Sequence, residues 1–325
     1  MKFRTSRRIT GLMVTIVASA VALTGCASGS QTSTAAASAG TVASTVDLHG
    51  VTLSVTSKEY TEEKVLGSVL VEALRAAGAT VNDKTGLQGT KLARAALDSG
   101  QADLYYEYTG TAWLTILGKT QPINDPQQLF DAVKAADAKN NIDWFARAPL
   151  NDTYAVGATS AAAKSTGVTT LSQYAALAKK DPAAATLCSS AEFATREDGL
   201  PGLEKAYGFT LPTSSIFQAE STVIFQAADQ GKCNFLKLDS TDARIAQQGI
   251  VVLQDDKSFF PVYNPAVSMR HDAYAAHQAQ YDQLFGAVSK LLTQDTIIKL
   301  NGDVELKGLP VDKVVHDFLV QNKIL

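Results

Sequence analysis

The stretch Val51-Thr52-Leu53-Ser54-Val55, followed closely by Thr61-Glu62-Glu63, decides the class of fold. The first part is apolar and β-branched, as buried strands commonly are. Thr61 can cap a helix whose first turn carries two acidic residues, and Gly78 is a natural stop for that helix. Between them, apolar residues recur on one helical face: Val65, Leu66, Val69, Leu70, Ala73 and Leu74. A strand followed directly by a helix is the repeating unit of α/β proteins.

The same alternation continues towards the C-terminus. Further strands are expected at 103–106, 153–156, 186–188, 235–238 and 251–253. Further helices are expected at 91–97, 171–180, 200–206, 221–229, 241–248, 272–292, 294–300 and 311–322. This pattern predicts an α/β fold with largely parallel sheets. About 280 residues follow the N-terminal region, enough for two modest domains or one large one.

The N-terminus has the form of an export signal. Four basic residues precede an apolar run from Ile9 to Leu23, which is shorter than the roughly 20 residues of a membrane span. The run ends in Leu23-Thr24-Gly25-Cys26, which resembles a bacterial lipoprotein cleavage box. We therefore expect residues 1–25 to be a lipoprotein signal peptide and Cys26 to carry acyl chains at the outer face of the cell membrane. An N-terminal anchor helix is the alternative.

Residues 26–45 are predicted to be a flexible tether, because small, uncharged residues cannot bury enough apolar surface to offset chain entropy. The folded part is expected to start near Val46. Besides Cys26, the chain has only Cys188 and Cys233. Two thiols in an oxidising compartment are expected to pair, which requires both in one domain; two separate buried thiols are the alternative.

Several classes of function lack support in the sequence. The formal net charge is −3 and no basic run follows the N-terminal segment, so no nucleic acid is expected as a partner. The four histidines show no metal-ligand spacing. A Gly-rich phosphate loop and a nucleophile elbow are also missing. We therefore expect no enzyme activity, metal or cofactor.

Polar and aromatic residues gather at the ends of the expected strands, where open α/β sheets place their ligands. Five short motifs share this position: Ser-Lys-x-aromatic-Thr-Glu at 57–62, Glu-Tyr-Thr-Gly-Thr at 107–111, Phe-x-x-Arg-x-Asp-Gly at 193–199, Ser-Thr-Asp-Ala-Arg at 240–244, and Asp-Asp-Lys-x-Phe-Phe-Pro-x-Tyr at 255–263. In this order and spacing they resemble the substrate-binding lipoproteins of ABC importers for glycine betaine, choline and related quaternary ammonium solutes. The resemblance extends from about residue 50 to residue 325.

The resemblance implies a periplasmic-binding-protein fold of type II, with a ligand cleft between two α/β lobes. One lobe would hold residues 46–149 and 264–325, and the other residues 150–263, with a hinge at the crossovers near 150 and 263. Cys188 and Cys233 would then share a lobe. The expected partners are an ABC permease and its ATPase, and the binding protein itself is expected to be a monomer.

The resemblance also implies how the solute is held. Its pattern matches box tyrosines at Tyr108, Tyr154 and Tyr263, whose ring faces attract a quaternary ammonium. The positions that match donors to a carboxylate tail are Lys58, Thr111 and Arg196. Without the motifs, Lys58 would be read as a solvated surface residue and Arg196 as an ion-pair partner of Glu197 or Asp198. Tyr60 stays ambiguous, and Trp113 and Trp144 are assigned to packing.

One position departs from the pattern. Asp239 stands where members of this branch commonly have a Tyr before Ser-Thr-Asp. An ionised Asp239 in the cleft would favour cationic solutes such as choline, and its smaller side chain would admit a larger one such as carnitine. Alternatively, Asp239 pairs with Arg196 or caps a helix that starts near Ser240. Because of Asp239, a second hypothesis stands beside the first: the same fold could bind a different solute, an amino acid or a bulkier aromatic compound.

Overall fold

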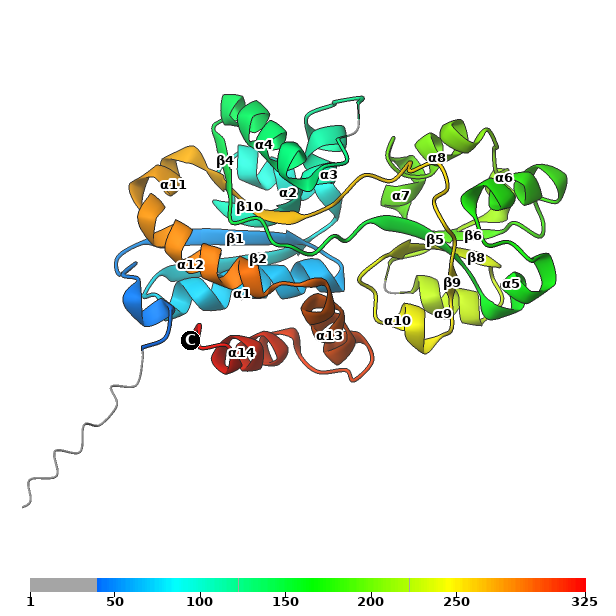
Figure 1. The fold of residues 1–325 in the computed structure, drawn as a ribbon. Coiled ribbons are helices and arrows are strands. Elements are labelled where there is room, and N and C mark those ends of the chain that lie inside the picture. Colours follow the sequence, from blue (N-terminus) through cyan, green and yellow to red (C-terminus); the bar gives the residue numbers. More distant parts are fainter. Residues whose placement is uncertain (1–39, 122, 222) are drawn as a thin grey trace, which may run out of the picture. The chain divides into compact units, whose positions relative to one another are not determined.

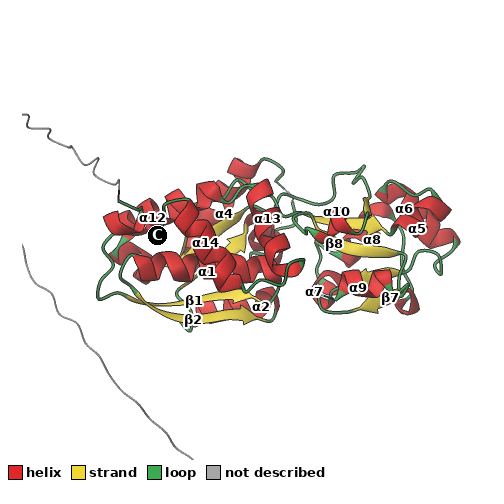
Figure 2. Ribbon diagram, turned by 90° about the horizontal axis from the view of Figure 1, so that it is seen from below, coloured by secondary structure: helices red, strands yellow, loops and turns green. Residues whose placement is uncertain are grey.

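The computed structural model describes residues 40–121, 123–221 and 223–325, and Gly40–Leu325 form one compact unit. The expected signal peptide, Cys26 and most of the expected tether lie outside the described residues. Two five-stranded sheets, each with helices packed against it, make up the described part (Figure 1 and Figure 2). No described helix is both long and apolar enough to cross a membrane.

The first sheet and the helices on it are called the first lobe below. In the order β2-β1-β3-β10-β4, its strands are β2 (Thr80–Leu87), β1 (Thr52–Lys58), β3 (Leu104–Tyr108), β10 (Pro265–Arg270) and β4 (Ile142–Phe145). Its helices are α1 (Thr61–Ala76), α2 (Gly89–Asp98), α3 (Thr109–Thr111), the π-helical turn Ala112–Ile116, α4 (Pro126–Asp137), α11 (His271–Ala276), α12 (Gln278–Leu291), α13 (Gln294–Glu305) and α14 (Val311–Gln321). Helix α1 packs on β1 and β2, and α14 packs against α1 (Figure 2).

The second sheet and its helices form the second lobe. In the order β7-β6-β8-β5-β9, its strands are β7 (Ile216–Gln218), β6 (Leu187–Ser189), β8 (Phe235–Asp239), β5 (Tyr154–Ala158) and β9 (Val251–Val252). Its helices are α5 (Ser160–Thr166), α6 (Leu171–Lys180), α7 (Ala191–Thr195), α8 (Leu200–Tyr207), α9 (Ile224–Asp229) and α10 (Arg244–Gln247). Cys188 and Cys233 form a disulfide in this lobe, within a buried cluster that includes Phe225 and Leu236.

The chain passes between the sheets twice, and this explains a departure from the expected strand directions. The sheets are mixed rather than mostly parallel, because β10 is antiparallel to β3 and β4, and β5 is antiparallel to β8 and β9. Both β5 and β10 directly follow a connecting segment, and each enters its new sheet against the direction of its neighbours. Figure 1 shows the two connecting segments side by side.

The connecting segments are also hydrogen-bonded to each other. The Asp152 N–H donates to the Tyr263 carbonyl (3.0 Å), and the Tyr263 N–H donates to Asn151 Oδ1 (2.6 Å). The Thr153 hydroxyl donates to the Pro261 carbonyl (3.1 Å). Two residues of the candidate site, Tyr154 and Tyr263, are therefore placed by this pair of segments.

The folded part begins a few residues before the expected start at Val46. The Val42 N–H donates to the Lys323 carbonyl (3.0 Å), and the Ala43 N–H donates to the Ile324 carbonyl (2.9 Å). Ala43 is 2% exposed, in the same apolar cluster as Ile324. The last residues of the expected tether are therefore fixed against the C-terminus, because this short apolar stretch finds a partner from the far end of the chain.

Candidate functional site

The seven residues that the sequence singles out for ligand binding line one small cavity of about 20 Å³. They are Lys58, Tyr108, Thr111, Tyr154, Arg196, Asp239 and Tyr263. Three further side chains complete its wall: Tyr60, Asp152 and Glu192. Both lobes contribute residues to this wall, so no single segment of sequence could form it.

The ends of strands bring these side chains together. Lys58 and Tyr108 are the last residues of β1 and β3, which lie side by side and parallel in the first sheet. In the second sheet, Tyr154 opens β5 and lies opposite Asp239, the last residue of β8. The sequence prediction that polar groups at strand ends converge is consistent with this geometry.

The Lys58 ammonium is buried and already has protein partners. Its Nζ donates to Glu107 Oε1 (2.7 Å) and lies 3.5 Å from Glu63 Oε1. It also lies 4.9 Å from the centroid of the Tyr108 ring and 5.9 Å from that of Tyr60. Lys58 is therefore no solvated surface residue, because its side chain is only 2% exposed.

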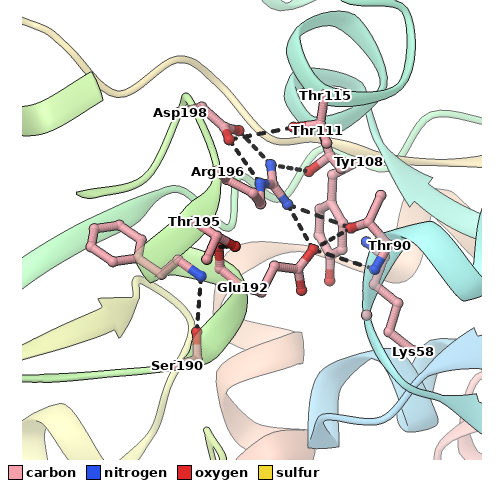
Figure 3. Close-up of polar contacts among 12 residues, drawn as sticks. Lys58, Thr90, Tyr108, Thr111, Thr115, Ser190, Glu192, Thr195, Arg196 and Asp198 are labelled. Carbon is pink, nitrogen blue, oxygen red and sulfur yellow. Dashed lines mark hydrogen bonds and ion pairs between the residues drawn. The ribbon is translucent and has the colours of Figure 1, made fainter. Parts of the chain in front are cut away.

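Arg196 links the two lobes (Figure 3). Its Nε donates to Asp198 Oδ1 (2.7 Å), and its Nη2 donates to Asp198 Oδ2 and to Thr111 Oγ1 (3.2 Å). Its Nη1 donates to Glu192 Oε1 (3.1 Å) and Thr90 Oγ1 (3.5 Å). These contacts match the five N–H groups of a guanidinium. Arg196 thus both lines the cavity and forms an ion pair with Asp198, and its bonds to Thr90 and Thr111 cross between the lobes.

Asp239 meets a different partner from either of those expected. Its carboxylate is bonded to the ammonium of Lys237, two residues earlier in β8. Within the described residues, Asp239 makes no hydrogen bond or ion pair with Arg196. Helix α10 is present but starts at Arg244 rather than near Ser240, so Asp239 does not cap it. Side chains two residues apart in a strand point to the same face, which is why Lys237 reaches Asp239.

Glu192 ties the second lobe to the start of α2. It accepts from the N–H of Thr90 (3.3 Å) and from its hydroxyl (2.5 Å), while Glu59 accepts from the N–H of Gly89 (2.8 Å). Two carboxylates therefore satisfy N–H groups at a helix end where no side chain of the helix itself caps them. Burial raises the pKa of Glu192, but Arg196, Lys58 and the Thr90 bond outweigh it and lower that pKa to about 2.

A second set of contacts between the lobes centres on Thr241. Its Oγ1 lies within hydrogen-bond distance of both Glu62 Oε2 and Asp152 Oδ1 (2.8 Å). A hydroxyl has one proton and ionised carboxylates only accept, so a proton on one of the two acids would satisfy both contacts. Burial, followed by neighbouring charge, raises the pKa of Asp152, and burial raises the pKa of Glu62 despite bonds from Thr241, Tyr108 and Asn301.

The buried acids predict how stability depends on pH. Burial raises the pKa of Glu63 from 4.5 to about 8, although Lys58 opposes this shift. The folded chain keeps this proton while the unfolded chain releases it above about pH 4.5, so stability should fall as pH rises from 4.5 to 8. Glu192 has the opposite effect on stability, and at lower pH. Its lowered pKa means that the stability it contributes is lost as pH falls from 4.5 to 2.

We expect Glu63→Gln to make the fall in stability between pH 5 and pH 8 shallower, because Gln resembles the protonated acid and cannot titrate. Urea unfolding at the two pH values measures this change. Glu197→Gln, at an exposed position, is the matched control and should leave the pH dependence as it is. An unchanged pH dependence in Glu63→Gln would show that Glu63 is ionised in the folded protein.

Sequence reasoning missed several residues of the site. Glu62, Asp152, Glu192 and Lys237 were not singled out, although Glu62 and Glu192 occur within or beside the quoted motifs. The position of Lys237 inside an apolar strand was a usable signal, because buried lysines are rare and need a partner. Within the described residues, no group of three or more His, Cys, Asp or Glu side chains could hold a metal ion.

Two α/β lobes with a cavity lined by tyrosine rings and buried charges define a solute-binding protein. A family model described as the substrate binding domain of ABC-type glycine betaine transport system matches residues 51–321. The chain belongs to this family. It is therefore an exported solute-binding component of an ABC transport system and not an enzyme.

Individual relatives agree with this assignment. A glycine-betaine-binding protein of Pseudomonas aeruginosa is 30% identical over 279 residues, covering 84% of this chain and 89% of the relative. The structure of apo YehZ from Escherichia coli is 29% identical, with a TM-score of 0.60, and covers 84% of this chain and 99% of that one. A glycine betaine/carnitine/choline ABC transporter structure, 23% identical with a TM-score of 0.64, shares the fold over 84% of this chain and 98% of its own.

Proposed function

We propose that the site binds a quaternary ammonium solute of the glycine betaine, choline or carnitine class, with Tyr108, Tyr154 and Tyr263 as its aromatic box. One observation carries the proposal: the ring faces at this cavity already hold cations. The Lys58 ammonium lies 4.9 Å from the Tyr108 centroid, and the Lys237 ammonium lies 4.7 Å from that of Tyr154. A quaternary ammonium has no N–H to donate, and ring faces attract it without one.

The same proposal assigns Lys58, Thr111 and Arg196 as donors to a short carboxylate tail. A zwitterion such as glycine betaine must then compete with Glu107 for Lys58 and with Glu192 for Arg196. A cation without a carboxylate, such as choline, needs no such exchange. Asp239 adds negative charge to the wall, which favours the cationic head.

In this proposal the protein is a monomer that delivers its solute to a membrane permease driven by an ATPase. Removal of residues 1–25 and acylation of Cys26 tether it to the outer face of the cell membrane. We propose lobe boundaries of 46–149 plus 264–325 and of 150–263. The segments near 150 and 263 then act as the hinge on which the lobes close around the solute.

A thermal-shift screen tests the proposal, with glycine betaine, choline, carnitine and proteinogenic amino acids as probes. A ligand that binds only the folded state raises the melting temperature in step with the logarithm of its concentration. We expect a rise with at least one quaternary ammonium solute. A rise with an amino acid alone would overturn the ligand class and leave the family assignment in place.

Tyr154 offers the cleanest test of the aromatic box. Its ring packs edge-on against Phe193, with centroids 5.2 Å apart. Tyr154→Leu should weaken quaternary ammonium binding by roughly 3-fold to 30-fold, since a ring contributes about 0.5–2 kcal/mol. Tyr154→Phe keeps the ring face and should bind like the parent. Isothermal titration calorimetry measures both, and equal affinities for the Leu and Phe variants would remove Tyr154 from the box.

A further inference from the structure

A second, larger chamber adjoins the cavity. Its volume is about 350 Å³, and it shares the walls formed by Tyr60, Tyr154, Glu192 and Asp239 with the small cavity. A space of 20 Å³ holds about one water molecule, whereas 350 Å³ lies within the range of small-molecule sites. A solute that reaches the Tyr154 ring in this structure must therefore do so from the chamber.

A cation of the chain already lies at this ring. Lys237 also lines the chamber, and its ammonium lies 4.7 Å from the Tyr154 centroid. The register of the second sheet explains the contact, because Tyr154 of β5 lies opposite Asp239 of β8, two residues beyond Lys237. Residues two apart in a strand share a face of the sheet. Lys237 is therefore the diagonal neighbour of Tyr154 on that face, and a long side chain spans such a distance.

Opening of the lobes would leave this contact intact. Strands β5 and β8 both belong to the second sheet, and so does Asp239, whose carboxylate is bonded to the Lys237 ammonium. The Lys237 side chain is only 5% exposed. A solute therefore meets Lys237 at the Tyr154 ring whether it arrives before or after the lobes close.

Lys237 is held by fewer bonds than the other cation at this ring. The Arg196 guanidinium lies 5.4 Å from the Tyr154 centroid, and its contacts match all five of its N–H groups. An ammonium has three N–H groups, and among the described residues the one hydrogen-bond partner of Lys237 Nζ is Asp239. Of the two cations, Lys237 is therefore the one that can leave the ring.

The chamber has room and charge for a second cation beside Lys237. Its wall carries four carboxylates, those of Glu59, Glu192, Glu220 and Asp239, and Lys237 is the one Lys or Arg among its described lining residues. Within the described part of the chain, neither Glu59 nor Glu220 forms an ion pair with Lys or Arg. The wall therefore keeps a net negative charge while Lys237 is paired, and a cationic solute can enter without expelling Lys237 from the chamber.

From these observations we infer that Lys237 is a resident cation on the Tyr154 ring, which the ammonium head of the solute displaces into the chamber. This inference rests on the proposed function, which places the head against the tyrosine rings. Lys237 is then an internal competitor that lowers the affinity for every quaternary ammonium solute. It also determines specificity, because only a cationic head replaces the attraction that the ring and Asp239 lose when Lys237 moves.

Lys237→Met removes the competitor, and choline is the probe because it has the ammonium head without a carboxylate. We expect the variant to bind choline roughly 3-fold to 30-fold more tightly, the range of one cation–π contact. Calorimetry on the purified full chain in detergent measures the change. Lys232→Met, at an exposed position of the same lobe, is the matched control for the loss of one positive charge and should bind like the parent.

The loss of Lys237 also unpairs Asp239, which attracts a cation by charge alone, so the contribution of the ring must be separated. A double-mutant cycle with Tyr154 separates it. In a Tyr154→Phe background, which keeps the ring face, Lys237→Met should tighten choline binding as much as in the parent. In a Tyr154→Leu background the gain should be much smaller. An equal gain in the Phe and Leu backgrounds would overturn the competition for the ring.

Nuclear magnetic resonance follows Lys237 in the parent protein, so this test does not depend on the folding of Lys237→Met. Protons above a ring face resonate upfield, and with isotope-labelled lysine the methylene next to Lys237 Nζ should do so; its loss in Lys237→Arg assigns it. Choline should return this signal towards the position of ordinary lysines. A signal that stays upfield at saturating choline would overturn the role of Lys237 alone. Absence of choline and glycine betaine binding in the parent and in Lys237→Met would overturn the proposed function itself.

Discussion

Replacing Arg196 with Met is expected to lower the free energy of unfolding by about 3–5 kcal/mol, because removing one partner of a buried ion pair leaves the other charge uncompensated. Asp198 is 1% exposed and receives two of the Arg196 hydrogen bonds. Its remaining donors are the Tyr263 hydroxyl (2.7 Å) and the more distant Thr115 hydroxyl (3.4 Å). Two neutral hydroxyl groups cannot replace a guanidinium.

Urea unfolding measures this loss as a shift of the transition midpoint. Arg75→Met is the control, because Arg75 is exposed and makes one long hydrogen bond, to the Val81 carbonyl (3.4 Å); surface changes of this kind stay within about 0.5 kcal/mol. Arg196→Lys should recover part of this loss, because lysine restores the positive charge but not the planar set of N–H donors of a guanidinium. A loss below about 1 kcal/mol in Arg196→Met would mean that the Asp198 carboxyl is neutral or solvated without its arginine.

Removal of the disulfide is the second large expected effect. Cys188 and Cys233 are 45 residues apart in sequence, and closing a loop of this length is expected to stabilise the fold by about 4 kcal/mol. The loop contains Glu192 and Arg196, so the bond also restrains a segment that reaches both the cavity and the first lobe. The double variant Cys188→Ala, Cys233→Ala should therefore unfold at a much lower urea concentration.

Reduction of the parent protein provides the control for this variant. Dithiothreitol should lower the stability of the parent to that of the double variant and leave the variant itself unaffected. Below the unfolding transition, the variant should still bind solute, because neither sulfur lines the cavity or the chamber. Equal stability of the reduced and oxidised parent would contradict the prediction.

The sequence indicated several elements with apolar periodicity, although it missed α4, whose Leu129 and Val133 are buried four residues apart. Helix α6 lies at the predicted residues 171–180, and α14 differs from its prediction by one residue. Strand β2 was missed because it is an edge strand, whose central residues Asn82, Asp83 and Lys84 are exposed. Strand β10 starts with a proline and so lacks a typical strand signature.

The candidate site was predictable as a set of positions but not as a set of contacts. All seven predicted residues line one cavity, because motifs at strand ends carry this information locally. The pairing of Lys58 with Glu107 joins residues 49 apart, and that of Arg196 with Thr111 joins residues 85 apart. Such contacts depend on how the lobes meet, and no local pattern encodes that. The partner of Asp239 was missed for another reason: Lys237 lay inside a strand that was assigned to the core.

The hydrogen-bonded pair of connecting segments makes the second lobe a cassette. The chain leaves the first lobe at Asn151 and returns at Tyr263, and one hydrogen bond of 2.6 Å joins these two residues. Insertions whose ends adjoin are readily exchanged between proteins. The second lobe contributes Tyr154, Arg196 and Asp239 to the cavity, whereas the first lobe contributes Lys58 and Tyr108. A chimaera spliced at these two points should therefore inherit half of its solute preference from each parent.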